Sequence, residues 1–495
     1  MKFNSLLNAL ISPWSLLVIF LCSSTFFIFQ FDIYPFFRDD TIYFNAARQF
    51  SEYQTIYGNA IINFDHSKIG EFNWYGPGYH LMYGIPSLIF GFNDGKTSLL
   101  LHVFLWTVAI ALLMRKFPKH RLSLSILMIA SPFYYYHFHF YPVVVNTFVT
   151  TISFLIMVQL IEGKEKSKFS IIVGFIFSIL FGAFLRITHV FSFALFYCRA
   201  NTKRKFLVLS LCFILLVGLT WLYQTYFCAP MFIGADETIN MLGDNDFISF
   251  GYIFIKNFIR NFIYYFLKIE FHDLQLWITL LASMISPLFL SKEKLDKIRP
   301  IYQGLLLTNL AYISVLFALY NANPFYLNKQ LIILLPANFI FIIVYLIQKK
   351  SHNTIFLIVN LLFFPFTLDK TNKALESAHQ CQHAKYDIEM IKNARELVFR
   401  NIKQENQKVV NILIDHKSFK SLNEIQYCAL FCELPFQSEA GNNLKNVFII
   451  HPHEEFSIDE RGDYLLSLTN MPASNKLSLV SKSPGLFLYK INKAI

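Results

Sequence analysis

The sequence predicts an α-helical polytopic membrane protein with about 11 transmembrane helices and a small C-terminal α/β domain outside the membrane. Of its 495 residues, 55% are hydrophobic and only 15% are charged, whereas an average soluble domain carries roughly 25% charged residues. The basic residues fall in short clusters between apolar runs rather than among the aromatic residues. We therefore interpret the net charge of +11 as topology information and expect no nucleic-acid partner.

The apolar runs give the expected membrane spans. A helix needs about 20 mostly apolar residues to cross a bilayer. The first run has no clear small-residue cleavage site, so we interpret it as a retained signal anchor. One short run, 187–198, suits a half-helix. The expected spans are 12–31, 97–114, 121–136, 143–161, 169–185, 187–198, 205–224, 274–290, 302–320, 327–347 and 353–368.

The basic clusters predict the orientation of these spans. With the N-terminus inside, clusters such as 115–121 and 292–299 all fall on the cytoplasmic side. Two long loops, 32–96 and 225–273, then face outward. The apolar segment Tyr79–Phe92 would reverse this order if it crossed the membrane, so we expect it to be interfacial or re-entrant.

The chain divides into two predicted domains. Residues 1–368 form the membrane domain, which we expect to be catalytic. Residues 369–495 form the outer domain, where a charged helix-compatible stretch is followed by four strand-like runs. These runs are Val409–Ile414, Val447–Ile450, Leu477–Val480 and Leu486–Ile491.

Two adjacent carboxylates, Asp39 and Asp40, follow the first span at the expected edge of the bilayer. A carboxylate there can act as a general base on an acceptor hydroxyl, with the second one orienting it or holding a metal. The alternative is a helix N-cap, a position that aspartate fills well. Both roles can hold at once, and we prefer Asp39 as the catalytic base.

A rigid turn ends the first outer loop, in the segment Asn73-Trp74-Tyr75-Gly76-Pro77-Gly78-Tyr79. Its glycines and proline define a turn. The aromatic side chains of Tyr75 and Tyr79 can stack on a sugar, although aromatic residues also collect at membrane surfaces without any ligand. We favour a structural role for the turn and keep both tyrosines as candidate substrate contacts.

Two cationic positions lie at the expected outer ends of spans. Arg186 and His189 occur in FLRITHVF, away from the cytoplasmic clusters, where a cation calls for an anionic partner such as a lipid phosphate. Snorkelling to headgroups or pairing with the acidic pair are the alternatives. Lys329 starts an outer-to-inner span, at the positive end of the helix dipole, so it suits either a phosphate site or interfacial anchoring.

His137 and His139 alternate in YYYHFHFYP. On an extended segment they would share one face and point into an outer cavity. They would then hydrogen-bond to substrate, or fill the interface, or bind a metal. A metal needs a third ligand, which the sequence does not specify, so we assign no metal ligands and no firm cofactor and keep a divalent metal as an option.

The order of four segments resembles the GT-C superfamily of polyprenyl-phosphate-sugar-dependent glycosyltransferases, which includes protein O-mannosyltransferases and the lipid A aminoarabinose transferase. The segments are RDDTIYFNAARQF, NWYGPGYHLMYGIPSLIFG, FGAFLRITHVF and FYLNKQLIILLPA, and they cover most of residues 1–368. The sequence departs from the family pattern at Asp40, where glutamate is more frequent, at Gly76, where proline is common, and at Lys329, which lies near the usual arginine.

The resemblance implies an enzyme that transfers a hexosyl or pentosyl group from a polyprenyl-phosphate carrier to a lipid, glycan or protein acceptor. It implies an active site and a C-terminal domain on the outer side, and we expect the plasma membrane of a bacterium. The competing hypotheses are a transporter that flips a lipid-linked glycan, and an envelope-assembly scaffold acting through residues 369–495. A transporter would be expected to carry polar or charged residues in the middle of several spans, whereas here the charges gather at span ends.

Overall fold

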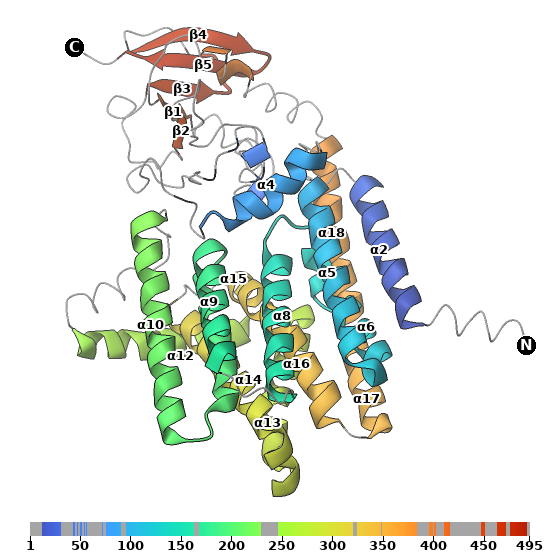
Figure 1. The fold of residues 1–495 in the computed structure, drawn as a ribbon. Coiled ribbons are helices and arrows are strands. Elements are labelled where there is room, and N and C mark those ends of the chain that lie inside the picture. Colours follow the sequence, from blue (N-terminus) through green and yellow to red (C-terminus); the bar gives the residue numbers. More distant parts are fainter. Residues whose placement is uncertain are drawn as a thin grey trace, which may run out of the picture.

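The computed structural model describes most of the chain. The described residues are 12–30, 76–90, 96–162, 168–228, 246–319, 324–347, 349–383, 410–415, 447–450, 463–471 and 476–492, with scattered positions between 43 and 72 and between 396 and 401. They form a bundle of helices with a small sheet beyond one of its ends, as Figure 1 shows. We call this end, which also carries helix α4 (Gly78–Phe90), the sheet end.

Long apolar helices form most of the bundle. Their side chains are apolar nearly all round, which is typical of helices surrounded by other helices and lipid. Six described helical stretches are long and apolar enough to cross a membrane. They are α2 (Pro13–Gln30), α5 (Lys96–Lys116), α10 (Lys203–Phe227), α14 (Lys292–Leu319), the stretch Asn328–Leu346 and the stretch Lys350–Glu376.

The expected count of about 11 spans is therefore corrected to six for the described residues. The other expected spans are helical, but the apolar stretches in four of them, Val143–Gln159, Gly174–Phe184, Thr188–Cys198 and Asp273–Phe289, are only 10–17 residues long. Breaks also interrupt them: residues 121–136 split into α6 (Arg121–Ile129) and α7 (Phe133–Tyr136). Pro132 lies in this break. It accounts for the break, because proline cannot continue an α-helix from the preceding turn.

The remaining elements complete the bundle, and some of them are parts of the stretches Asn328–Leu346 and Lys350–Glu376. The helical elements are α8 (Val143–Glu162), α9 (Lys168–Phe184), the 3₁₀-helix η3 (Ile187–Arg199), α12 (Phe247–Leu267), α13 (Phe271–Ile285), α15 (Pro324–Leu331), α16 (Leu335–Ile340), α17 (Lys350–Leu361) and α18 (Phe364–His383), with short 3₁₀ or π turns η2 (Pro118–His120), η4 (Ser286–Phe289), η5 (Ile332–Leu334) and η6 (Phe341–Leu346). Helix α12 lies inside the stretch expected to be an outer loop. Helix α18 continues through Leu368, the expected domain boundary.

The C-terminal sheet has five strands in the order β2-β1-β3-β5-β4. The strands β1 (Val410–Ile414), β2 (Val447–Ile450) and β3 (Tyr464–Ser467) are parallel, whereas β4 (Leu477–Ser483) and β5 (Leu486–Ile491) pair antiparallel to their neighbours. Four strands coincide with the predicted runs. The sequence analysis missed β3, a run of only four residues, all of them buried.

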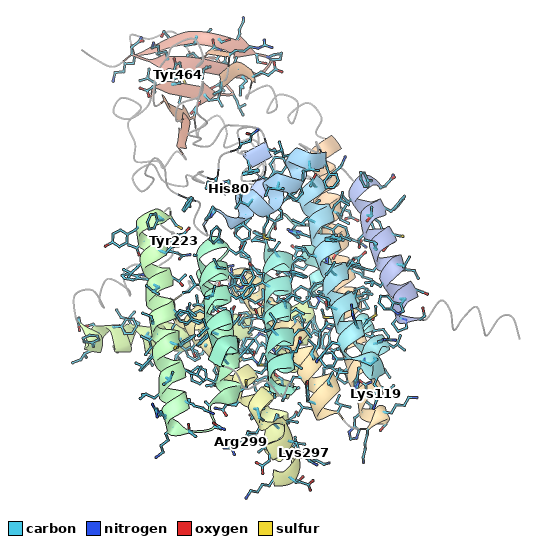
Figure 2. All side chains as sticks on the ribbon, viewed as in Figure 1. His80, Lys119, Tyr223, Lys297, Arg299 and Tyr464 are labelled. Carbon is cyan, nitrogen blue, oxygen red and sulfur yellow. The ribbon has the colours of Figure 1, made fainter. Side chains whose placement is uncertain are left out.

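The two ends of the bundle carry different side chains. Figure 2 shows Lys119, Lys297 and Arg299 at the end away from the sheet, while His80 and Tyr223 lie towards it. We call the first of these the basic end. Helix α4 lies obliquely across the bundle at the sheet end (Figure 1), as expected for an interfacial segment.

Candidate functional site

Most of the predicted site residues that the structure describes lie together near the sheet end. Tyr79, Arg186, His189, His139 and Lys329 all belong to one continuous cluster of polar and aromatic side chains, as the contacts below establish. The predicted residues Asp39, Asp40 and Tyr75 lie outside the described residues.

The glycine-proline-glycine turn seats α4 against the end of α9. Gly76 has a φ of +89°, a backbone conformation that suits glycine. A Cβ at Gly78 would lie 2.2 Å from the carbonyl oxygen of Phe184. The turn therefore packs directly against the backbone of Phe184, two residues before Arg186. Such packing is what the structural role expected for the turn requires.

Asn146, in the first turns of α8, connects three elements. The Tyr79 hydroxyl donates to its Oδ1 at 3.0 Å, and Nε2 of His189 lies 2.7 Å from the same oxygen. All three side chains are buried. Because this oxygen can only accept, His189 carries its proton on Nε2 and presents an acceptor at Nδ1. The predicted residues Tyr79 and His189 are thus joined by a residue that the sequence analysis did not single out.

A row of aromatic rings leads from Tyr79 to Lys329. The ring of Tyr43 packs edge-on against that of Tyr79, with centroids 5.1 Å apart, and against that of Tyr141 at 6.5 Å. The Lys329 ammonium lies 4.3 Å from the centre of the Tyr141 ring, within the range of a cation–π contact. Because Tyr43 comes four residues after Asp39 in the sequence, the predicted acidic pair precedes a residue of this cluster.

His137 and His139 have different surroundings. They lie in turns after α7 and not on an extended strand. His137 packs against Phe20 and Trp106 and lies 2.7 Å from the carbonyl oxygen of Phe133. His139 packs against Tyr135 and stacks on Tyr141, so it alone joins the cluster around Lys329.

No metal site is formed by the part of the chain that the structure describes: no three histidine, cysteine, aspartate or glutamate side chains come together there in a way that could hold an ion. Among these residues, the two histidines therefore do not gain the third ligand that a metal requires.

The structure adds Asp273, which the sequence analysis left in an outer loop. Among the described residues with a formal charge, only Arg186, Lys329 and Asp273 are buried. Asp273 lies in the first turn of α13, and its charge acts on the hydroxyls of Tyr136 and Tyr265. The sequence feature that could have identified Asp273 is its position just before an apolar run. Buried charges cost several kcal/mol unless they are met by partners, so the burial of all three indicates a site.

Asp273 and Lys329 are linked through Tyr265. The Tyr265 hydroxyl donates to Oδ1 of Asn328, next to Lys329, and accepts from the Trp277 indole at 2.7 Å. Burial raises the pKa of Tyr265 well above its usual range, and the charge of Asp273 adds to this rise. Tyr265 therefore stays a neutral hydrogen-bond donor at any ordinary pH.

A third cation, Lys370 of α18, lies at the edge of this cluster. Its ammonium is 3.3 Å from a carboxylate oxygen of Glu270 and 5.2 Å from the centre of the Tyr135 ring. Glu270 is exposed, and such pairs contribute little to stability. The contact places the start of α13 beside α7 and α18.

Buried histidines outside the six candidate spans predict a pH-dependent stability. Burial lowers the pKa of His80 from 6.5 to about 4, and it lowers that of His137 to about 4 against the opposing effect of its backbone hydrogen bonds. Between about pH 6.5 and 4 the unfolded chain therefore binds more protons than the folded protein. The free energy of unfolding falls as the pH drops through this range.

We expect the unfolding temperature to be constant above about pH 7 and to fall between pH 6.5 and 4, each ring contributing up to about 3 kcal/mol. His80→Gln should reduce this fall when unfolding is followed by tryptophan fluorescence. His352→Gln, which changes an exposed side chain of α17, is the control and should leave the profile unchanged. An unaltered profile in His80→Gln would contradict the expectation.

Comparison with known proteins gives no relative: no protein-family model, curated protein or solved structure matches the chain. What the fold defines is a helical membrane protein with a small C-terminal sheet. Any narrower class rests on the arrangement of the site itself.

Proposed function

We propose that the protein is a membrane glycosyltransferase. It transfers a sugar from a polyprenyl-phosphate carrier to a lipid, glycan or protein acceptor on the outer side of the membrane, which corresponds to the sheet end. The observation that carries the proposal is the burial of Arg186, Lys329 and Asp273, the buried charges of the described residues, among tyrosines and histidines. Such a set of side chains suits a ligand in which an anionic group lies beside a group rich in hydroxyls.

The basic residues support this orientation. Lys119, Lys297 and Arg299 lie at the opposite end (Figure 2), and an excess of lysine and arginine is typical of the cytoplasmic side. The sheet end then faces outward, with the C-terminal sheet outside the membrane. The plasma membrane of a bacterium is the setting that we propose.

The chemistry is a single displacement with inversion. Asp39 accepts the proton of the acceptor hydroxyl, and the hydroxyl oxygen bonds to the anomeric carbon of the donor sugar. The bond from that carbon to the carrier phosphate breaks, and the phosphate leaves with the electron pair. Arg186 and Lys329 stabilise the negative charge that develops on it. Because the donor is already activated, the reaction needs no nucleotide.

The test is sugar transfer by the purified protein in detergent. Cells lacking the protein should accumulate the lipid-linked donor, so an extract of their lipids supplies it. We expect Asp39→Ala to lower the rate by at least about 100-fold, the scale of a lost general base, and Asp40→Ala to lower it less. Asp296→Ala, at an exposed position, is the control. Full activity in both loop variants would remove the proposed base.

The buried polar residues Asn309, Asn338 and Ser283 do not form the charged path that a transporter would use. Asn309, Asn338 and Ser283 bond to one another across three helices, with Asn309 Nδ2 donating to Asn338 Oδ1 at 2.8 Å. These groups satisfy each other and carry no charge, so they suit helix packing better than an ion or substrate path. Transfer in detergent solution also separates the hypotheses, since a flippase needs two sides of a membrane.

A further inference from the structure

A group of buried hydroxyls lies beside Arg186. The hydroxyls of Thr188, Ser192 and Tyr312 are buried, with residue exposures of 2%, 4% and 0%, and none makes a hydrogen bond of ordinary length and angle, although the three lie within weak hydrogen-bonding reach of one another. His189 Nδ1, on the same helix as Thr188 and Ser192, likewise makes no such bond. Nearly all buried polar atoms in proteins are well hydrogen-bonded, so the three hydroxyls together require an explanation.

These groups converge from two helices. Thr188 and Ser192 belong to η3, and Tyr312 belongs to α14. The Tyr312 hydroxyl interacts weakly with those of Ser192, Thr188 and Thr150, the last of them on α8, and lies within the electrostatic reach of Arg186. The Tyr312 ring packs edge-on against Phe191, with centroids 5.4 Å apart, which fixes the direction of its hydroxyl. Arg186 lies just before η3, as its N-cap. We call these four residues, Arg186, Thr188, Ser192 and Tyr312, the hydroxyl pocket.

The backbone here is also unusual. The helix η3 keeps 3₁₀ geometry for 13 residues, whereas runs beyond about four residues are uncommon and often mark functional segments. Three residues per turn bring His189 and Ser192 to the same side of the helix. A close approach holds the segment in place, because a Cβ at Gly304 of α14 would lie 2.5 Å from the carbonyl oxygen of Leu195.

Apolar side chains at these positions would leave no buried polar atom without a hydrogen bond. The hydroxyls therefore indicate a ligand that supplies hydrogen-bond acceptors. Three hydroxyl donors and a guanidinium match a group with several oxygen atoms and a negative charge. We propose that the hydroxyl pocket binds one phosphate group, that of the polyprenyl monophosphate carrier. This inference rests on the proposed function and assigns Thr188, Ser192 and Tyr312 to the leaving group of the reaction.

A ligand-binding role and a structural role predict opposite effects on stability. If Tyr312 binds ligand, its hydroxyl is poorly hydrogen-bonded in the free protein, and Tyr312→Phe should leave the unfolding temperature unchanged or raise it. The matched control is Tyr302→Phe on the same helix. The Tyr302 hydroxyl donates to the Met284 carbonyl oxygen at 2.7 Å, so its removal leaves an acceptor unpaired and should lower the unfolding temperature.

The experiment measures binding of a short-chain polyprenyl monophosphate to the full chain in detergent, with no sugar or acceptor present. We expect Tyr312→Phe and Ser192→Ala each to weaken binding by about 10-fold or more, as for a hydrogen bond to a charged group. Tyr302→Phe should bind as the wild type does. Because no transfer is needed, this result is independent of the base variants that test the proposed function.

Competition identifies the source of the phosphate. Inorganic phosphate and phosphatidylglycerol vesicles should each compete poorly with the polyprenyl monophosphate. Equal competition by inorganic phosphate would mean a general anion site, and equal competition by phosphatidylglycerol would mean a headgroup site, so either would overturn the assignment to the carrier. Unchanged binding in both pocket variants, with a lowered unfolding temperature in Tyr312→Phe, would mean that water fills the hydroxyl pocket and that its role is structural.

Discussion

Arg186→Met is expected to reduce sugar transfer by roughly 1000-fold while the protein still folds. The residue is 5% exposed and supplies the positive charge of the hydroxyl pocket. In the proposed reaction the carrier phosphate gains negative charge as the sugar leaves, and loss of one donor to such a charge typically costs 100- to 1000-fold. Loss of the buried cation adds to this, since water cannot readily replace it.

Arg186→Lys separates charge from geometry. Lysine keeps the charge but not the planar fork with five donors, so we expect an intermediate rate. The rates are measured in the same detergent assay, with size-exclusion chromatography to verify folding. Arg121→Met is the matched control, because Arg121 is a part-buried arginine at the other end of the bundle that donates to the Met114 carbonyl oxygen at 2.9 Å. Near-normal transfer in Arg186→Met would assign the residue to lipid anchoring, which was the alternative hypothesis.

The sequence predicted the cations of the site because each contradicted a pattern. Arg186 lies away from the basic clusters, and Lys329 was expected to begin a span at the positive end of the helix dipole. The structure instead places Lys329 in the last turn of α15. Charge is so rare in this chain that one misplaced cation is conspicuous. Such local arguments do not need to know which helices are neighbours.

Residues whose role depends on neighbouring helices could not be predicted in this way. Asp273 resembles an ordinary acid at the start of a helix, and only the packing of the folded bundle around α13 buries it. Tyr312, Ser192 and Thr188 are unremarkable in sequence, because hydroxyls within membrane helices commonly bond to the preceding turn. That they make no hydrogen bond of ordinary length and angle is a property of the folded bundle.

The fold could be predicted where the hydrophobic periodicity of a run and its length indicate the same kind of element. The apolar runs all form helices, but their division into six long and several short stretches depends on breaks such as the one at residues 130–132. Helix α12 was missed because Lys256 and Arg260 interrupt its apolar residues, so the segment resembles a loop between spans. Strand β3 was missed because four buried residues show no alternation.

Gly78→Ala is expected to lower sugar transfer by about 100-fold through displacement of the site, although residue 78 touches no substrate in the proposed reaction. The new Cβ would lie 2.2 Å from the Phe184 carbonyl oxygen and 2.8 Å from Leu185 Cδ2, distances that real carbon atoms do not reach. The start of α4 must then move away from the end of α9, which separates Tyr79 from Asn146 and shifts Arg186. A displacement of about 1 Å can cost on the order of 100-fold in rate.

A second glycine variant distinguishes this displacement from a general effect of the substitution. Gly218 lies in the helix α10, and the Cβ that Gly218→Ala adds would meet nothing within 4 Å. Alanine in an open helix position should raise stability by about 0.5–1 kcal/mol and leave transfer unchanged. Because the closest approach at Gly78 is to the backbone oxygen of Phe184, no rotamer change can relieve the clash. A Gly78→Ala protein with normal transfer and a normal unfolding temperature would therefore show that the turn does not hold Arg186 in place.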